Sequence, residues 1–301
     1  MTETDKKKQP ILIDGKATAA SIKQELKKIV SDLLDAGKRA PHLAAVLVGD
    51  DGASKTYVAS KEKQSTEVGF TSSVYRYPAD ISEQELLDVI HFLNNDEEID
   101  GYIVQLPLPK HINERKILSA VSPSKDVDGA HAESIGKMLL GEPTFVPATP
   151  KGVMTLLERH DIATQGKNCV VIGRSNIVGT PMALLMSRNH RHANCTVTLC
   201  HSKTENLKEI CLQADIIIVA IGKPCFLKAD MVREGAVVID VGIHRIPDDT
   251  KKNGYRLEGD VDYTNVAPKC SYITPVPGGV GPMTIVSLLQ NTLQAYNNNH
   301  K

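Results

Sequence analysis

Residues 168–181 read Asn168-Cys169-Val170-Val171-Ile172-Gly173-Arg174-Ser175-Asn176-Ile177-Val178-Gly179-Thr180-Pro181. The stretch begins with a short apolar run rich in β-branched side chains, which predicts a buried parallel strand. The run stops at Gly173, and after a small loop a helix is expected, with Pro181 suited to its first turn. A strand that feeds a helix in this way directs backbone N–H groups and the positive end of the helix dipole at one point. The stretch therefore predicts an anion site.

The same loop partly matches the fingerprint of dinucleotide-binding proteins. Gly173 and Gly179 stand near the first and last glycines of that fingerprint, but Ser175 occupies the middle position. Arg174 adds a positive charge. A dinucleotide phosphate is the favoured ligand, and an ordinary strand-to-helix turn without a ligand is the alternative.

The next expected strand, at residues 196–200, ends without the acid that binds the adenosine ribose in NAD enzymes. Ser202 and Lys203 stand there instead and offer hydrogen-bond donors to a 2′-phosphate. One or two charge-assisted hydrogen bonds would give roughly a ten- to hundredfold preference. We therefore predict NADP rather than NAD, although Lys203 by itself could be a solvated surface lysine.

Two more apolar strands, at residues 215–222 and 236–242, each end in glycine. Apolar strands that alternate with helices predict a parallel sheet covered on both faces. Ligands of such sheets bind at the carboxyl ends of the strands, where Gly173, Gly222 and Gly242 fall. This half of the chain is expected to be a Rossmann-like domain.

Composition excludes several functional classes. The 301 residues suffice for about two domains, and the net charge of −1 gives no field that would recruit nucleic acid or anionic membrane. No apolar run approaches the roughly 20 residues of a membrane span, and no secretory signal is apparent, so we expect a cytoplasmic protein. The six cysteines form no CxxC pair and are expected to be reduced. No metal is expected, because the one candidate group (His190, His192, Cys195) surrounds a polar loop.

The first half of the chain predicts a separate α/β unit. Helices are expected at residues 16–36, 53–68 and 86–93, the last opened by a capping box from Ser82 to Glu85. Strands are expected at residues 43–49, 73–77 and 101–109. Thr149, as cap, and Pro150 are expected to start a helix that links the two halves.

Three features of this half suggest chemistry. Tyr57 and Lys61 are four residues apart on one expected helix and share a face, although such pairs are common on solvated helices. Gln105 interrupts an apolar strand, and a buried amide needs partners. Asp128 precedes Gly129 in a turn, where it could bind a ligand or be a simple loop carboxylate.

A fourth feature is residues 274–284, with three prolines and three glycines in eleven residues. Such a loop is stiff and lets its backbone approach a ligand closely, which we favour over an interdomain hinge. It is followed by an expected helix at residues 285–293 that can return to the first domain.

Together these segments resemble the bifunctional methylenetetrahydrofolate dehydrogenase/cyclohydrolase family. The resemblance runs from about residue 11 to residue 293, and the most specific motif is the last. The segments that carry it are Tyr57-Val58-Ala59-Ser60-Lys61, Val104-Gln105-Leu106-Pro107-Leu108, Lys125-Asp126-Val127-Asp128-Gly129, residues 173–181 and residues 275–284.

The resemblance implies an α/β fold of two domains. Residues 10–149 with 283–301 would form the folate-binding catalytic domain, and residues 150–282 the Rossmann-like NADP-binding domain, with a cleft between them. It implies oxidation of methylenetetrahydrofolate with NADP, hydrolysis of the methenyl product to 10-formyltetrahydrofolate, and a homodimer. A monofunctional dehydrogenase of the same family is the alternative.

The resemblance also assigns roles to residues. Lys61 would be the central catalytic group, tuned by Gln105, while Tyr57 would stack on the folate and Asp128 would anchor its pterin. One departure concerns residues 201–202, where this chain has His-Ser and many bacterial relatives have His-Arg. The other substrate-binding candidates are Ser54, Pro277, Gly278 and Gly279, and the cofactor-binding candidates are Gly173, Arg174, Ser175, Ile177, Ser202, Ile243 and Thr284.

Overall fold

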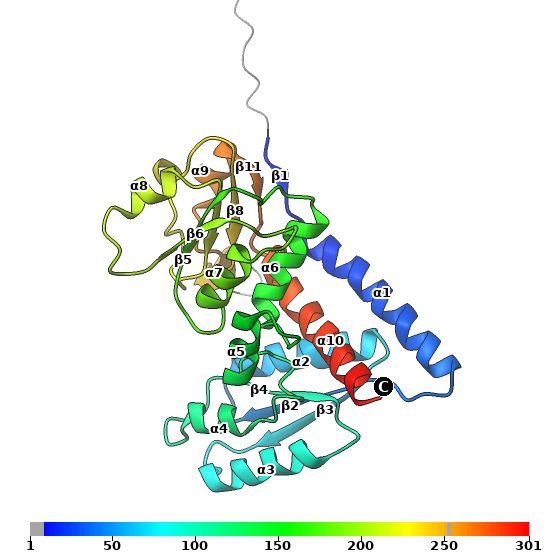
Figure 1. Ribbon diagram of the computed structural model, residues 1–301. Coiled ribbons are helices and arrows are strands. Elements are labelled where there is room, and N and C mark those ends of the chain that lie inside the picture. Colours follow the sequence, from blue (N-terminus) through cyan, green and yellow to red (C-terminus); the bar gives the residue numbers. More distant parts are fainter. Residues whose placement is uncertain (1–8, 252–253, 301) are drawn as a thin grey trace, which may run out of the picture. The chain divides into compact units, whose positions relative to one another are not determined.

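The computed structural model describes residues 9–251 and 254–300, which form two compact units. Residues 20–148 and 285–300 make up the N-terminal unit, and residues 9–19 and 149–284 make up the C-terminal unit (Figure 1). This grouping places residues 10–19 with the C-terminal unit, because β1 (Ile11–Leu12) pairs with β11 (Cys270–Ile273). In the described part of the chain, no helix is both long and apolar enough to span a bilayer.

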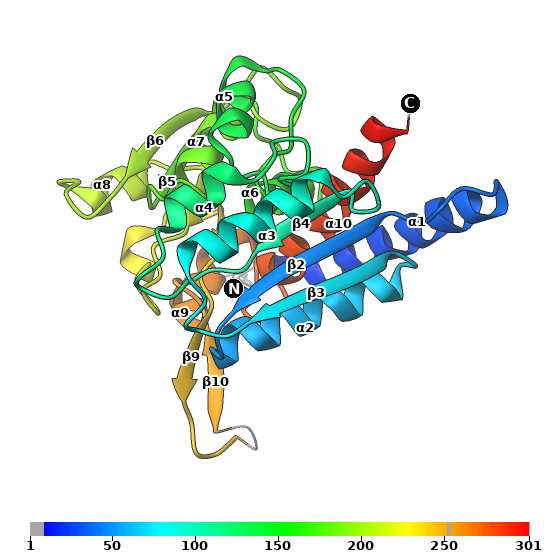
Figure 2. The same cartoon turned by 90° about the horizontal axis from the view of Figure 1, so that it is seen from below.

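The N-terminal unit is built on a parallel sheet with the strand order β3-β2-β4. Its strands are β2 (His42–Val48), β3 (Thr71–Tyr77) and β4 (Gly101–Val104). Helix α2 (Gly52–Glu67) covers one face of this sheet and α3 (Glu83–Asn95) the other (Figures 1 and 2). The capping box at Ser82 and Glu85 is present as predicted, and the apolar face of α3 packs on alternate residues of β2.

Strand β4 is shorter than the sequence indicated, because the chain leaves the strand geometry at Gln105. The Gln105 backbone N–H still donates to the Val46 carbonyl (2.9 Å), and a cis peptide follows between Leu106 and Pro107. Two helices that the sequence did not indicate, α4 (Glu114–Ala120) and α5 (Ala132–Leu140), complete this part of the unit.

The C-terminal unit contains a six-stranded parallel sheet in the order β1-β11-β8-β7-β5-β6, as predicted for a Rossmann-like domain. Strand β5 has β6 and β7 as its neighbours, and the glycines that follow β5, β7 and β8 lie at the carboxyl edge. The bounds are β5 (Asn168–Ile172), β6 (Thr196–Cys200), β7 (Ile216–Val219) and β8 (Ala236–Asp240).

Short elements surround this sheet. Figure 2 shows the antiparallel hairpin of β9 and β10 projecting as a separate ribbon. The elements are α7 (Gly179–Ser187), α8 (Leu207–Leu212), η1 (Ala229–Met231), β9 (His244–Pro247), β10 (Tyr255–Glu258), α9 (Tyr263–Val266) and η2 (Ala267–Lys269).

Three long helices belong to both units or border them: α1 (Gly15–Asp35), α6 (Ala148–Arg159) and α10 (Val280–Asn299). Helix α10 begins five residues earlier than predicted, because Pro282 falls in the first turn, where a missing N–H costs no helical hydrogen bond. Helix α6 begins at Ala148, so Thr149 lies inside the helix and is not its cap. The Thr149 hydroxyl instead lies 3.0 Å from that of Thr284.

Candidate active site

Helix α2 presents one buried face to the sheet of the N-terminal unit. Its start is capped by Asp51, whose carboxylate accepts the Ser54 N–H (2.7 Å). The buried residues of the helix follow the spacing of one helical face, and Tyr57 lies half-buried beside them. They are Ser54, Val58, Lys61 and Ser65.

The Lys61 amine lies among groups that hold it in one place. The residue is only 6 % exposed. Its Nζ donates to Gln105 Oε1 (3.3 Å) and stands 4.3 Å from the centre of the Tyr57 ring. The structure therefore brings Gln105, from the end of β4, to the Tyr57 and Lys61 pair that the sequence had placed on one helix face.

Burial changes the proton affinity of this group. Desolvation lowers the pKa of Lys61 to about 8, and the nearby negative charge of Asp128 partly opposes that shift. Desolvation also raises the pKa of the Tyr57 hydroxyl, so Tyr57 stays neutral at physiological pH. The arrangement supplies an amine that can exchange a proton near neutrality beside a neutral aromatic ring.

Gln105 is oriented by its own backbone surroundings. Its side-chain Nε2 donates to the Leu106 carbonyl (2.7 Å), which leaves Oε1 directed at Lys61. A buried amide with partners was predicted here. The residue is half-buried, and both ends of its amide have a partner.

The turn that carries Asp128 is held from helix α10. The Asn291 side chain donates to the carbonyls of Val127 (2.8 Å) and Val146 (3.0 Å), on either side of the turn. Gly129 has φ +70°, and a Cβ there would lie 2.7 Å from the Pro147 nitrogen. Asn291 was not among the predicted site residues, because an asparagine in an apolar helix carries no sign of its partners.

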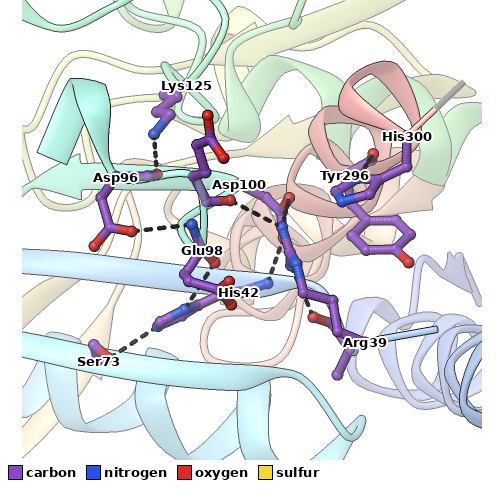
Figure 3. A network of polar contacts seen from close by, with 11 residues as sticks. Arg39, His42, Ser73, Asp96, Glu98, Asp100, Lys125, Tyr296 and His300 are labelled. Carbon is purple, nitrogen blue, oxygen red and sulfur yellow. Dashed lines mark hydrogen bonds and ion pairs between the residues drawn. The ribbon is translucent and has the colours of Figure 1, made fainter. Parts of the chain in front are cut away.

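Lys125, in the same motif, has a different environment. Its buried Nζ donates to the carbonyls of Leu93 (2.9 Å) and Asp96 (2.5 Å). It belongs to a polar network at the amino edge of the sheet, in which Arg39 binds the buried Asp100 carboxylate and lies over the Tyr296 ring (Figure 3). Gln105 follows the opposite end of β4, so Lys125 anchors the fold and lies away from Lys61.

The loop after β5 has the close backbone packing that its glycines predicted. A Cβ on Gly173 would lie 2.1 Å from the Ala220 oxygen, and one on Gly179 would lie 2.0 Å from the Gly173 oxygen. The Ser175 hydroxyl accepts the N–H groups of Val178 (3.2 Å) and Gly179 (3.3 Å). Two N–H groups of the expected anion site are thus bound by Ser175, and Arg174 and Ser175 are exposed beside them.

The other cofactor candidates lie in the same unit. The turn after β6 exposes Ser202 and Lys203, and the His201 N–H donates to the Thr204 hydroxyl (2.8 Å). Ile177 and Ile243 are large apolar residues left 57 % and 58 % exposed. Exposed donors and bare apolar side chains at one sheet edge fit the phosphates and rings of a dinucleotide phosphate.

The loop at residues 274–284 packs tightly on the start of α1. The Gly278 oxygen accepts the Lys16 N–H (2.9 Å), and Gly279 lies so close to Gly15 that a Cβ on Gly15 would collide with its oxygen. Gly278 has φ +108°, and the peptide between Val276 and Pro277 is cis. Pro277 is exposed in this loop.

Comparison with known proteins identifies the family. Residues 13–128 match the model of the tetrahydrofolate dehydrogenase/cyclohydrolase catalytic domain, and residues 147–300 match that of its NAD(P)-binding domain. The bifunctional protein FolD of Porphyromonas gingivalis is 60 % identical over 94 % of this chain and 96 % of its own length.

Solved structures agree with the sequence relatives. The bifunctional FolD enzyme of Campylobacter jejuni is 48 % identical with a TM-score of 0.89, over 95 % of this chain and 98 % of that one. The Trypanosoma brucei enzyme, solved with NADP and an inhibitor, is 35 % identical with a TM-score of 0.92, over 98 % and 99 %. The chain belongs to the tetrahydrofolate dehydrogenase/cyclohydrolase family.

Proposed function

We propose that this chain is a bifunctional enzyme of one-carbon folate metabolism. It oxidises 5,10-methylenetetrahydrofolate to 5,10-methenyltetrahydrofolate with NADP, and it hydrolyses the methenyl product to 10-formyltetrahydrofolate. The observation that carries the proposal is the Lys61 amine, buried against Tyr57 and hydrogen-bonded to Gln105. A family member confined to dehydrogenation would not need an amine tuned for proton transfer near neutrality.

The hydrolytic step uses Lys61 as a proton acceptor. Water attacks the methenyl carbon, and the neutral amine takes a proton from that water to leave a neutral carbinolamine. The hydroxyl of this carbinolamine then loses its proton as the ring C–N bond breaks, and the departing ring nitrogen gains a proton, which gives the formyl group. With a pKa of about 8, roughly one Lys61 in four is neutral at pH 7.5, whereas an ordinary lysine is almost wholly protonated. A cationic substrate beside the amine favours the neutral form further.

Neighbouring residues position the folate. Tyr57 offers a neutral ring on which a flat pterin can stack, and Asp128 offers a carboxylate to its donor groups. Gln105 directs the amine through the contact at Oε1. Placement of flat rings is the main requirement of hydride transfer, which suits this rigid setting. Further substrate contacts are assigned to Ser54, Pro277, Gly278 and Gly279.

NADP supplies the hydride acceptor, and residues of the C-terminal unit hold it. Arg174, Ser175 and Ser202 bind its phosphates through exposed donors. Ile177, Ile243 and Thr284 contact its rings and ribose, and Gly173 allows the backbone to pass close by. Ser202 and Lys203 stand where NAD enzymes have an acid, and the lack of that negative charge favours binding of a 2′-phosphate.

The proposal extends to the compartment in which the enzyme works and to its assembly. We assign it to the cytoplasm, since all six cysteines are free thiols, which is typical of a reducing compartment. A homodimer is proposed by family analogy, and sedimentation equilibrium would measure it.

The replacement of Lys61 by Met tests the proposal. Lys61→Met removes the proton acceptor but keeps an unbranched buried side chain, so hydrolysis of the methenyl substrate should fall at least 100-fold, with a smaller loss of dehydrogenation. The two steps are assayed separately, by NADPH formation and by decay of the methenyl chromophore. Lys63→Met, on the exposed side of the same helix, is the matched control and should leave both rates unchanged. Full hydrolysis by Lys61→Met would reject the proposal.

A further inference from the structure

The turn after β7 contains three backbone N–H groups that point at one carboxylate. Ile221 (2.8 Å) and Gly222 (3.1 Å) donate to Asp260 Oδ2, and Lys223 (2.8 Å) donates to Oδ1. Successive N–H groups that converge in this way form an anion-binding concavity. This one lies at the carboxyl edge of the sheet, next to the loop that follows β5.

The Asp260 carboxylate is built into its place. The residue is fully buried, and the His244 ring nitrogen Nε2 lies 2.8 Å from Oδ1. The Asp260 backbone N–H donates to Asp240 Oδ1 (2.9 Å). Gly242 passes so close that a Cβ there would lie 2.4 Å from the Asp260 Cγ. Each oxygen of the fully buried carboxylate thus has two polar contacts.

A direct series of contacts leads from this carboxylate to the phosphate loop. Asp260 holds the N–H of Ile221, and Ile221 with Ala220 forms the surface on which Gly173 packs. A Cβ on Gly173 would lie 2.1 Å from the Ala220 oxygen and 3.4 Å from the Ile221 Cγ2. A shift of the 221–223 turn must therefore displace the loop that begins at Gly173.

We infer that Asp260 is a positioning residue for the dinucleotide. Its carboxylate fills the anion-binding turn at residues 221–223 from inside and fixes that turn against Gly173. The cofactor phosphates are thereby directed to the loop of Arg174 and Ser175 and excluded from the neighbouring turn. The inference rests on the proposed binding of NADP in the C-terminal unit.

Asp260→Asn tests this role with little change in shape. An amide presents an NH₂ donor on one side, where it meets backbone N–H donors and cannot accept from them. The amide removes one backbone hydrogen bond if its NH₂ replaces Oδ1 and two if it replaces Oδ2, and the others lose the charge of their acceptor. In a buried site this should raise the KM for NADP about tenfold or more, with kcat within threefold of the wild type. Methenyl hydrolysis, assayed without NADP, reports whether the Lys61 site is intact and should persist.

Asp262→Asn is the matched control. It makes the same change of charge two residues away, but the Asp262 carboxylate contacts Lys228 and Asn265 rather than the turn. Its KM for NADP should equal that of the wild type. A KM for NADP within twofold of the wild type in Asp260→Asn would overturn the inference.

A second variant applies if Asp260→Asn fails to fold. Gly222 has φ +69° and open space around its Cβ position, so Gly222→Ala strains only the turn. The KM for NADP should again rise, and an unchanged value would also overturn the inference. A wild-type protein that does not reduce NADP with methylenetetrahydrofolate would instead refute the proposed function.

Discussion

Lys61 destabilises the fold that positions it. Each tenfold change in proton affinity corresponds to about 1.4 kcal/mol, so the fall of its pKa from 10.5 to about 8 corresponds to roughly 3 kcal/mol. Well below pH 8 the residue is protonated in both states, and the folded state bears the whole cost of a buried charge. Between pH 8 and 10.5 the unfolded chain binds more protons than the folded one, so stability rises with pH.

This linkage predicts that Lys61→Met stabilises the protein at pH 7, by up to about 3 kcal/mol, while it abolishes hydrolysis. The gain should shrink as the pH approaches 10, because the wild-type amine is then neutral when folded. Urea denaturation at pH 7 and pH 10 measures both values. Lys63→Met, which is exposed, should show no such dependence, and an equal gain for Lys61→Met at both pH values would contradict the argument.

At the scale of elements, the sequence predicted the features of helices that depend only on residues a few positions apart. The face of α2 and the capping box of α3 follow from spacings of three and four residues, and both are present. The predicted start of α10 was wrong, because Gly281 and Pro282 were interpreted as part of a loop. Both residues are tolerated in a first turn, where the backbone N–H groups have no helical partners.

Residues whose role depends on distant partners could not be predicted. Asn291 meets its carbonyls across more than 140 residues of sequence, and Asp260 meets its N–H donors across about 40. Tyr57, Lys61, Gln105 and Asp128 were proposed from motifs, but how they group in space could be described only from the fold. Asp240 lies at the end of an apolar strand, and its role as the buried acceptor of the Asp260 N–H also became visible only in the fold.

Helix α10 can be tested through Asn291. Asn291→Leu leaves the buried carbonyls of Val127 and Val146 without this donor, which should destabilise the protein by about 1–3 kcal/mol. Because the released turn carries Asp128, the KM for the methenyl substrate should rise more than kcat falls. Gln294→Leu, which removes a single long contact to Thr144 (3.4 Å), is the control for both measurements. Unfolding in urea and initial rates would show whether stability and KM change together. A normal KM would show that the Asn291 contact from α10 does not affect substrate binding.

At the scale of the whole molecule, the two sets of proposed site residues belong to different compact units. Lys61, Gln105 and Asp128 lie in the N-terminal unit, and the loop at Gly173 lies in the C-terminal unit. A defect confined to one unit should therefore separate two reactions that the intact enzyme performs in succession.

Gly173→Ala makes such a defect. With φ +121° and a Cβ 2.1 Å from the Ala220 oxygen, alanine would force the phosphate loop away from β7. Dehydrogenation should lose at least 100-fold in kcat/KM for NADP, whereas methenyl hydrolysis without NADP should stay within about fivefold of the wild type. Gly166→Ala, with φ +70° and open space in the same unit, carries the backbone strain without the collision and should keep both activities. If Gly173→Ala lost both reactions equally while its thermal unfolding stayed normal, the phosphate loop would serve hydrolysis too, and the two reactions would not be divided between the units.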